Sequence, residues 1–408
     1  MLVLRAIFAA SVAMCSVSAQ NAPLTADNLP ALDEPTSDAT PDKVLLYVGT
    51  YSRDEGWLNG QGKGVHVFEM DTMDGSLTAK GFTAVGNNPT FVSGTNDKNR
   101  RMIYAVNEVE EQSTDKPGTT TAHVYALSAD ETGALTVVNR QETGGWGAVH
   151  VSVSPKEDYV AVSNFGAGSV RLFPLSTNGS LLPGSDFIQY VGGSNAVPAR
   201  QNAPHPHSMT WVGGESSGVF VADLGNDRIG QYDAKDGKLV PNPAGEFVKR
   251  PAGSGPRHMV VHPHGNFFYA VDEISNTVGV HPLDSATGAI GEAIQQITTF
   301  PEDFKETNNA ADIHMTSCGS YLYASNRGHD SIAMYKVGED GKLTSLGYEK
   351  TRGKIPRNFL VYKKFLLAAH QTTNDIHVFT IDFKTGLLNY TGKSTECGTP
   401  VSLFIPRY

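Results

Sequence analysis

The chain carries a set of His, Arg and Glu residues at the starts and ends of short apolar segments. Arg has a planar fork that suits a carboxylate or a phosphate, and a nearby His or Glu can move protons. Together these types indicate acid–base chemistry on an anionic substrate. The residues are His205, His207, Arg257, His258, Glu273, His314, Arg327 and Arg357.

Some of these residues differ in type from the residues at the matching places in the other repeats. We predict that these four are catalytic: His207, Arg257, Glu273 and Arg327. Five further residues are candidates for substrate binding: His205, His258, His314, Arg357 and Gln371.

A structural role stays open for part of the set. Three histidines take one aligned position, and repeated equivalents usually hydrogen-bond between repeats, so a structural role is favoured for them. They are His150, His258 and His314. Glu108 follows a strand as Glu273 does, but it could pair locally with Arg100 or Arg101.

Short strands that repeat along the chain must position these residues. An apolar second strand ends in Asn, Asp or His at a period of roughly 50 residues, and an alternating third strand follows each one. The 42 Gly and 22 Pro supply the turns that many short strands need. We expect second strands at 102–107, 159–164, 218–223, 268–272, 321–326 and 365–370. We expect third strands at 123–127, 169–173, 228–232, 277–281, 331–335 and 375–379.

These segments make six units, and a seventh can be assembled from the two ends of the chain. Segments 45–49 and 64–68 supply two strands, and segment 398–403 resembles a first strand. We therefore predict an all-β fold over residues 43–408. It is a seven-bladed β-propeller of four-stranded blades, with the N- and C-terminal strands closing the ring in one blade. Two stacked β-sandwiches are the alternative, which the regular period disfavours.

Charge and composition exclude several classes of protein. The 32 basic and 42 acidic residues give a net charge of −10, which argues against non-specific binding to nucleic acid. Neither Cys-x-x-Cys nor His-Glu-x-x-His occurs, so we predict no metal and no cofactor. We expect Cys318 and Cys397 to be separate thiols, although a disulfide between them stays open. A monomer is the default expectation.

The first 19 residues have the features of a secretory signal. One positive charge precedes an apolar run over Ala6–Val17, and small residues end the segment at Ala19. The run is too short to cross a bilayer. We therefore expect cleavage after Ala19, a flexible leader over residues 20–42, and a secreted protein without a membrane partner. Glycans at Asn178 and Asn389 stay open.

Six short motifs follow one another along the chain. They are YVGTY at 47–51, APHPHS at 203–208, GPRH at 255–258, YAVDE at 269–273, AADIH at 310–314 and YASNRG at 323–328. In this order they resemble the seven-bladed propeller lactonase family, which contains bacterial-type 6-phosphogluconolactonases and fungal carboxy-cis,cis-muconate cyclases. The resemblance extends from about Lys43 to the C-terminus.

The resemblance implies an active centre of His, Arg, Glu and Arg, which His207, Arg257, Glu273 and Arg327 match. It implies metal-free opening of a lactone, in which the two arginines hold the substrate anion and polarise the carbonyl. Either the His or the Glu then acts as general base on water. In the family an Asn is usual at two positions where this chain has Asp272 and His370.

The function expected first is that of a secreted hydrolase, similar to 6-phosphogluconolactonase, that opens an anionic sugar-type lactone. A muconate cyclase is the second hypothesis, because lactonisation uses the same groups in reverse. A secreted propeller that only binds a partner is the third. Exposed aromatic loops around Trp57 or Trp146 would favour that third hypothesis.

Overall fold

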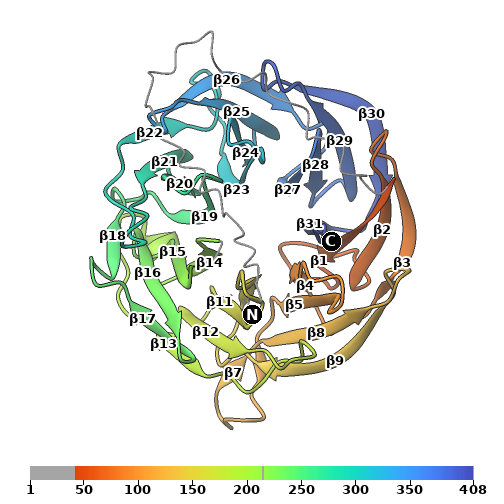
Figure 1. The fold of residues 1–408 in the computed structure, drawn as a ribbon, viewed down its shortest axis with the longest axis vertical. Helices are drawn as coiled ribbons and strands as arrows, with labels where there is room; N and C mark the ends of the chain where they lie inside the picture. The colour runs from red at the N-terminus through yellow and green to blue at the C-terminus, as the bar shows by residue number, and fades with distance from the viewer. Residues whose placement is uncertain (1–41, 214–215, 408) are drawn as a thin grey trace, which may run out of the picture. The chain divides into compact units, whose positions relative to one another are not determined.

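Residues 42–213 and 216–407 are described by the structure, which is a computed structural model. Their strands form seven blades arranged in a ring (Figure 1). This confirms the predicted seven-bladed β-propeller of four-stranded blades, and one blade carries a fifth strand. The predicted signal at 1–19, and the leader at 20–42 except for Asp42, lie outside the described residues.

Each blade runs from an innermost strand near the ring centre to an outer strand at the rim (Figure 1). The innermost strands are β31 (Pro400–Phe404), β4 (Pro89–Gly94), β10 (Ala148–Val153), β14 (Pro206–Trp211), β19 (Pro256–Val261), β23 (Asn309–Met315) and β27 (Pro356–Tyr362). The second strands are β1 (Lys43–Thr50), β5 (Met102–Asn107), β11 (Tyr159–Asn164), β15 (Gly218–Asp223), β20 (Phe267–Asp272), β24 (Tyr321–Arg327) and β28 (Phe365–His370).

The outer half of each blade is a hairpin. The third strands are β2 (Val65–Asp71), β8 (His123–Ala129), β12 (Ser169–Pro174), β16 (Arg228–Lys235), β21 (Thr277–Pro282), β25 (Ser331–Val337) and β29 (Asp375–Ile381). The outermost strands are β3 (Leu77–Thr83), β9 (Leu135–Glu142), β13 (Asp186–Gln189), β17 (Lys238–Pro241), β22 (Gln295–Thr298), β26 (Leu343–Lys350) and β30 (Leu388–Glu396). Outside this pattern lie β6 (Glu111–Gln112), β7 (Thr120–Thr121), β18 (Phe247–Lys249) and the helix α1 (Pro198–Gln201).

One blade is built from both ends of the chain, as predicted. The C-terminal strand β31 pairs antiparallel with β1, which places Phe404 opposite Tyr47 and Ser402 opposite Gly49. In the same sheet β1 pairs with β2 and β2 with β3. Because this pairing joins the first and last segments of the propeller, the ring of blades closes and β1 is not left as a sheet edge.

Burial explains why the second strands have continuous apolar sequences. Every residue of β5 is buried, whereas β9 in the same blade has four of its eight residues exposed. A second strand is covered on both faces by the neighbouring blades, so both sets of alternate side chains meet protein. The apolar core lies between the blades in seven clusters. One of them joins Val48 of the first blade to Leu367 of the last.

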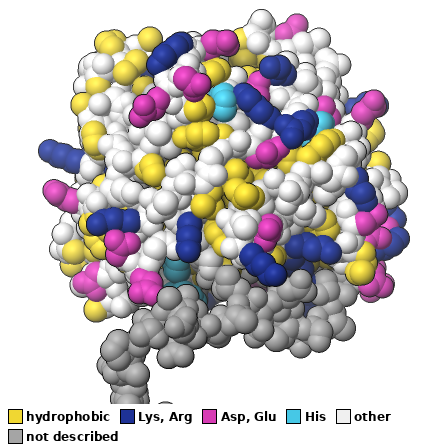
Figure 2. Space-filling model, turned by 90° about the horizontal axis from the view of Figure 1, so that it is seen from above, with side chains coloured by type: hydrophobic (Ala, Val, Ile, Leu, Met, Phe, Trp, Pro, Cys, Tyr) yellow, Lys and Arg dark blue, Asp and Glu magenta, His cyan; other side chains and the backbone are white. Residues whose placement is uncertain are grey.

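The surface carries charges of both signs, and the two cysteines in the described part of the chain form no disulfide. On the face shown in Figure 2, Lys and Arg side chains are interspersed with Asp and Glu. Cys318 and Cys397 are both free thiols, as expected. Among residues 42–213 and 216–407, no helix has the length and apolar character needed to cross a membrane.

Candidate active site

A β-bulge at the start of the innermost strands leaves one residue outside the ladder. In β14, Pro206 pairs with Asp223 and Ser208 with Ala222, so His207 between them has no partner on β15. The same irregularity recurs in five other blades. The residues left over are Thr90, Val149, His207, Arg257, Arg357 and Val401. Bulges re-aim side chains, and all six of these line one pocket.

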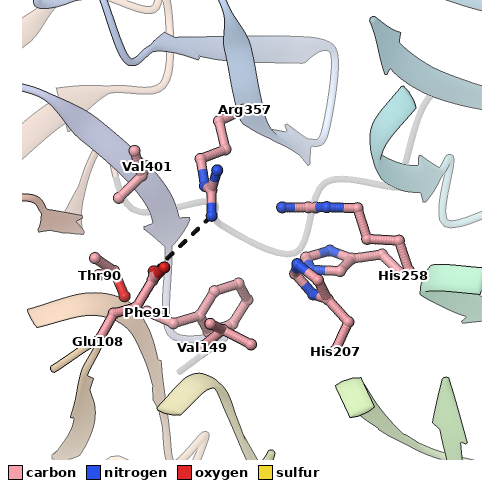
Figure 3. A pocket seen from close by; sticks show the side chains of 9 residues that line it. Thr90, Phe91, Glu108, Val149, His207, His258, Arg357 and Val401 are labelled. Carbon is pink, nitrogen blue, oxygen red and sulfur yellow. Dashed lines mark ion pairs between the residues drawn. The ribbon is translucent and has the colours of Figure 1, made fainter. Parts of the chain in front are cut away.

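The pocket lies where six of the seven innermost strands converge. It has about 250 Å³ of space, including its open mouth, and Phe91, Glu108 and His258 complete its walls. His207 and His258 lie side by side on one wall, while Arg357 and Glu108 point toward each other (Figure 3). The pocket therefore combines two imidazoles with groups of both charges.

A second set of polar side chains comes from the ends of the second strands. Glu108 follows β5, and Glu273 follows β20. The backbone N–H of Glu108 donates to the carbonyl of Asn88 at 2.9 Å, and that of Glu273 to the carbonyl of Gly255 at 2.7 Å. These bonds hold each residue beside the start of the innermost strand in its own blade. In these two blades the repeat thus places two polar residues at the same end of the blade, Thr90 with Glu108 and Arg257 with Glu273.

Glu273 is the centre of a buried ion-pair cluster. Its Oε2 atom accepts from Nε of Arg257 at 2.9 Å and lies 2.8 Å from Nη2 of Arg327. Its Oε1 atom pairs with Arg200, on helix α1. Arg257 is 2 % exposed, and its Nη1 donates to the carbonyl of Ala311 at 2.6 Å. The guanidinium of Arg257 is thereby fixed from two sides.

The charges of this cluster decide which of its groups can exchange protons. Burial would raise the pKa of Glu273, but Arg327, Arg257 and Arg200 together hold it well below the ordinary value. The carboxyl is therefore ionised and is a weak base. Burial, followed by the charge of Arg327, lowers the pKa of Arg257 to about 9. Arg257 stays a cation at neutral pH.

His207 is a buried imidazole with an unused nitrogen. It is 5 % exposed, and its Nδ1 atom has no hydrogen-bond partner among the described residues. Its ring meets that of His258 edge to face, with centroids 5.2 Å apart. Burial, reinforced by the charge of Arg257, holds the pKa of His207 well below its ordinary value. The ring is therefore neutral at pH 7 and has a lone pair to offer.

His258 and His314 share a carboxylate, Asp312. Nδ1 of His258 lies 2.7 Å from Oδ1 of Asp312, and Nε2 of His314 lies 3.0 Å from Oδ2. The alignment that grouped His314 with His150 and His258 is wrong in register. His258 lies opposite Val271, one residue before the end of β20, whereas His314 lies opposite Tyr323, three residues before Asn326.

The irregularity in β23 has the same size as in the other blades. Ala310 pairs with Asn326 and Ile313 with Ala324, so Ala311 and Asp312 oppose Ser325 alone, again one extra residue. Asp312 therefore takes the aligned position of His258, and His314 lies two residues further along β23. His314 is one-third exposed and does not line the pocket. Asp312 fixes the ring of His258, whose pKa burial and Arg257 lower to about 4.

Glu108 pairs across the ring rather than locally. The hydroxyl of Tyr51 donates to its Oε2 at 2.6 Å, and Nη2 of Arg357 lies 3.8 Å from the same atom. The suggested partner Arg100 instead lies 3.9 Å from Glu157. The possibility of a local pair did not take account of Tyr51 and Arg357, which reach Glu108 from two other blades.

The remaining predicted site residues lie outside the pocket wall. His205 precedes β14, stacks on Phe165 with centroids 4.5 Å apart, and bonds through Nδ1 to the Phe165 carbonyl. Gln371 follows β28, and its Oε1 atom has no hydrogen-bond partner in the described part of the chain. Glu273 and Arg327 do not line the pocket either; Glu273 pairs with Arg257, which does, and Arg327 pairs with Glu273.

Sequence reasoning missed three residues of this assembly. Arg200 lies on α1, in a segment outside the repeat, so the alignment of blades gave no signal for it. Tyr51 and Asp312 both lie inside the six motifs, but their roles depend on partners in other blades.

One group of three side chains that could hold a metal occurs among residues 42–213 and 216–407. It lies in the last blade, outside the pocket, at His370, Asp375 and His377.

The fold and the pocket can be compared with known proteins. The family model "Lactonase, 7-bladed beta-propeller" matches residues 45–405. The chain belongs to this family. A 6-phosphogluconolactonase from Bacillus subtilis (strain 168) is 31% identical to the chain over 363 residues. These residues cover 88% of the chain and 97% of the relative. The resemblance read from the six motifs is thereby confirmed.

Two further members of this lactonase family extend the comparison. A 6-phosphogluconolactonase from Formosa agariphila is 29% identical over 84% of the chain and 94% of the relative. The solved periplasmic gluconolactonase of Pseudomonas aeruginosa is 27% identical, with a TM-score of 0.78 over 89% of the chain and 99% of that structure. Membership in the family supports a lactonase activity for the chain.

Proposed function

We propose that the protein hydrolyses an anionic, sugar-type lactone to its hydroxy acid, in the manner of a 6-phosphogluconolactonase. The observation that carries this proposal is the position of His207. Its unused, buried Nδ1 atom belongs to a side chain that shares one small pocket with Arg257 and Arg357. A base, a fixed cation and a second cation are the groups that hydrolysis of an anionic lactone needs.

His207 is the general base in this proposal, and Glu273 is not. Three arginines hold Glu273 ionised and stabilise that form, so the carboxylate has little tendency to take a proton from water. The pKa of His207 lies well below its ordinary value, so the ring is neutral and one of its nitrogens carries a lone pair. Binding of an anion beside Arg257 and Arg357 offsets part of the charge that depresses the pKa of His207, and so strengthens the base when substrate is present.

The two pocket arginines have different roles. Arg257 is held by Glu273 and by the Ala311 carbonyl, so its guanidinium is oriented before substrate arrives and can stabilise an oxyanion. Arg357 has only a long ion pair, 3.8 Å, with Glu108. Its donors suit the phosphate or carboxylate of the substrate. Glu273 acts through Arg257 and is a positioning residue.

The proposed reaction is one addition and one elimination. His207 accepts a proton from water as the water oxygen bonds to the lactone carbonyl carbon, and Arg257 stabilises the resulting oxyanion. The carbonyl then re-forms and the ring C–O bond breaks. The leaving alkoxide takes the proton from the imidazolium of His207, which returns the neutral base and releases the hydroxy acid.

The charge of the assembly supports an anionic substrate. Four guanidinium groups face three carboxylates, Glu273, Glu108 and Asp312, which leaves an excess of one positive charge. The arginines are Arg200, Arg257, Arg327 and Arg357. This local excess contrasts with the net charge of −10 of the whole chain. A field of this kind raises the concentration of anions at the mouth of the pocket.

Exposed aromatic residues favour the hypothesis of a binding propeller to a limited extent. Trp57 is 63% exposed and Trp146 39% exposed. Trp57 packs edge-on against Tyr51, at 5.5 Å between ring centroids, so part of it is held by the fold. Single exposed aromatic side chains are common on proteins and do not make a docking patch. The hydrolase remains the proposed function.

A panel of lactones tests the proposal. The purified chain is assayed on 6-phosphogluconolactone, gluconolactone and carboxymuconolactone, beside the Arg257→Ala and Glu273→Gln variants. We expect turnover, fastest on a phosphorylated or carboxylated lactone, and its loss in Arg257→Ala. Lactonisation of carboxymuconate without hydrolysis of any sugar lactone would favour the cyclase. No turnover from a folded chain would favour the binding propeller.

We further propose that the protein is exported, as the features of residues 1–19 indicate. The support is in the sequence alone: a short apolar run that ends in small residues at Ala19. The test is the N-terminal sequence of the chain recovered from outside the cytoplasm. We expect it to begin at Gln20, and an uncut chain retained in the cytoplasm would contradict export.

A further inference from the structure

We propose that His370, Asp375 and His377 form a site for one zinc-class divalent cation, in the last blade and outside the pocket. Their ligating atoms all lie within 4.8 Å of one another. Nδ1 of His370 lies 2.8 Å from Oδ1 of Asp375, and Nε2 of His377 lies 3.4 Å from Oδ2. Ligands bound tetrahedrally about 2.1 Å from Zn²⁺ stand about 3.4 Å apart, so small side-chain shifts suffice.

Buried nitrogens without partners are the first sign of a ligand here. Nε2 of His370 and Nδ1 of His377 have no hydrogen-bond partner in the described part of the chain. Nδ1 of His370 pairs with the carboxylate of Asp375, 2.8 Å away. His370 is 0% exposed. Buried polar groups are nearly always satisfied in native proteins, and a bound cation accepts the lone pair of an imidazole nitrogen that has no other partner.

The position of His370 and Asp375 holds a neutral hydrogen-bonded pair in two other blades and an ion pair, Asp223 with Arg228, in a third. Nδ2 of Asn164, at the end of its second strand, donates to the hydroxyl of Ser169, which begins the third strand, at 3.0 Å. Asn326 makes the same bond in its own blade. In the last blade a His and a carboxylate replace this neutral pair, at His370 and Asp375. A neutral pair could therefore join the second and third strands of the last blade, without a His or a carboxylate.

His377 is a third departure from the repeat at the same place. It lies two residues after Asp375 on β29, so both side chains project from one face of the strand. The matching residues are small in three other blades, Gly230, Gly279 and Ala333, and large in two, Tyr125 and Arg171, and none of these five is a His, Cys or carboxylate. The ring of His377 stacks on Tyr390 with centroids 5.5 Å apart, which fixes its plane.

The fold also makes room for the buried ring. A Cβ atom at Gly353 would lie 2.3 Å from the ring of His370, so only glycine fits beside it. Two imidazoles and one carboxylate are a donor set that zinc favours, whereas Ca²⁺ and Mg²⁺ prefer oxygen ligands alone. The Asp375 side chain is 22% exposed, so water can complete the coordination. No step of the proposed hydrolysis uses these residues, so the two proposals stand independently.

Metal titration of the whole chain tests the site. The purified chain is treated with chelator and desalted, and Zn²⁺ binding is followed by calorimetry and Co²⁺ binding by visible absorption. We expect one ion per chain, a tetrahedral or five-coordinate Co²⁺ spectrum and a higher melting temperature with Zn²⁺. Asp375→Asn keeps the size of the side chain and should weaken Zn²⁺ binding by more than about 100-fold.

A second histidine pair supplies the matched control. His262 and His264 lie at the surface with ring centroids 5.2 Å apart, and neither belongs to the three-residue group. His264→Gln should leave the stoichiometry and affinity for Zn²⁺ unchanged, while His377→Gln should abolish tight binding. Circular dichroism checks that each variant is folded. A wild-type chain that binds no Zn²⁺, or a folded Asp375→Asn variant that binds it as tightly, would overturn the proposal.

Discussion

The Nε atom of Arg257 donates to Oε2 of Glu273 across 2.9 Å, where the bulge of β19 meets the residue that follows β20. Both side chains are buried, and neighbouring strands of one blade supply them. The bulge of β19 places Arg257 on the pocket wall, and the bond to Glu273 fixes the orientation of its guanidinium. The proposed chemistry depends on this geometry, because a guanidinium that is already oriented stabilises an oxyanion without reorganising.

Neutralising Glu273 should therefore reduce activity although it removes no group from the pocket. Glu273→Gln leaves three arginines around a neutral amide, so Arg257 loses its orientation. We expect kcat to fall by about 10²–10³-fold and the free energy of unfolding to fall by about 3–5 kcal/mol, as for a broken buried pair. Steady-state kinetics and urea unfolding measure the two effects. Glu131→Gln, at an exposed site, is the control and should change neither.

Arg357 should distinguish charged from neutral lactones. Arg357→Gln removes the cation that we assign to the substrate anion and leaves His207 and Arg257 in place. We expect KM for a phosphorylated lactone to rise by about 10–100-fold, the loss of one charge-assisted contact of roughly 1.5–3 kcal/mol. KM for gluconolactone should change little. An equal effect on both substrates would show that Arg357 does not bind the anion.

The stability of the propeller should fall in mild acid because of its buried histidines. The pKa of His258 is about 4 in the folded chain, below the ordinary 6.5. The unfolded chain therefore binds more protons between these values, and the free energy of unfolding falls as pH drops from 6.5 to 4. His258 accounts for about 3 kcal/mol of this loss. Urea unfolding at a series of pH values measures it, and His258→Gln should flatten the curve.

The repeat made the second strands and the ring closure predictable. Residues 102–107, 159–164 and 365–370 are strands with the predicted bounds, because burial on both faces gives them continuous apolar sequences. The bulges could not be predicted, since a single unpaired residue leaves no trace in the apolar pattern. In β23 the position that matches His258 is Asp312, so aligning His314 with His258 misplaced His314 by two residues.

Contacts between distant segments were the other part that the sequence did not reveal. Arg200 lies outside the repeat and reaches Glu273 across 73 residues of chain. The expectation of no metal rested on two short motifs, and the spacing of His370, Asp375 and His377 matches neither. The departure of His370 from the usual Asn was visible in the sequence, but its meaning depended on what faced it across the hairpin.

The pH dependence of kcat/KM, for the wild-type chain and for His207→Gln on 6-phosphogluconolactone, tests the central claim most directly. The pKa of His207 lies below its ordinary 6.5, so the base stays unprotonated into mild acid. We predict a wild-type rate that falls only below pH 6.5. In folded His207→Gln we predict a loss of about 10²–10⁴-fold and no such acid limb. A folded variant that keeps the wild-type rate and the same acid limb would show that His207 is not the base.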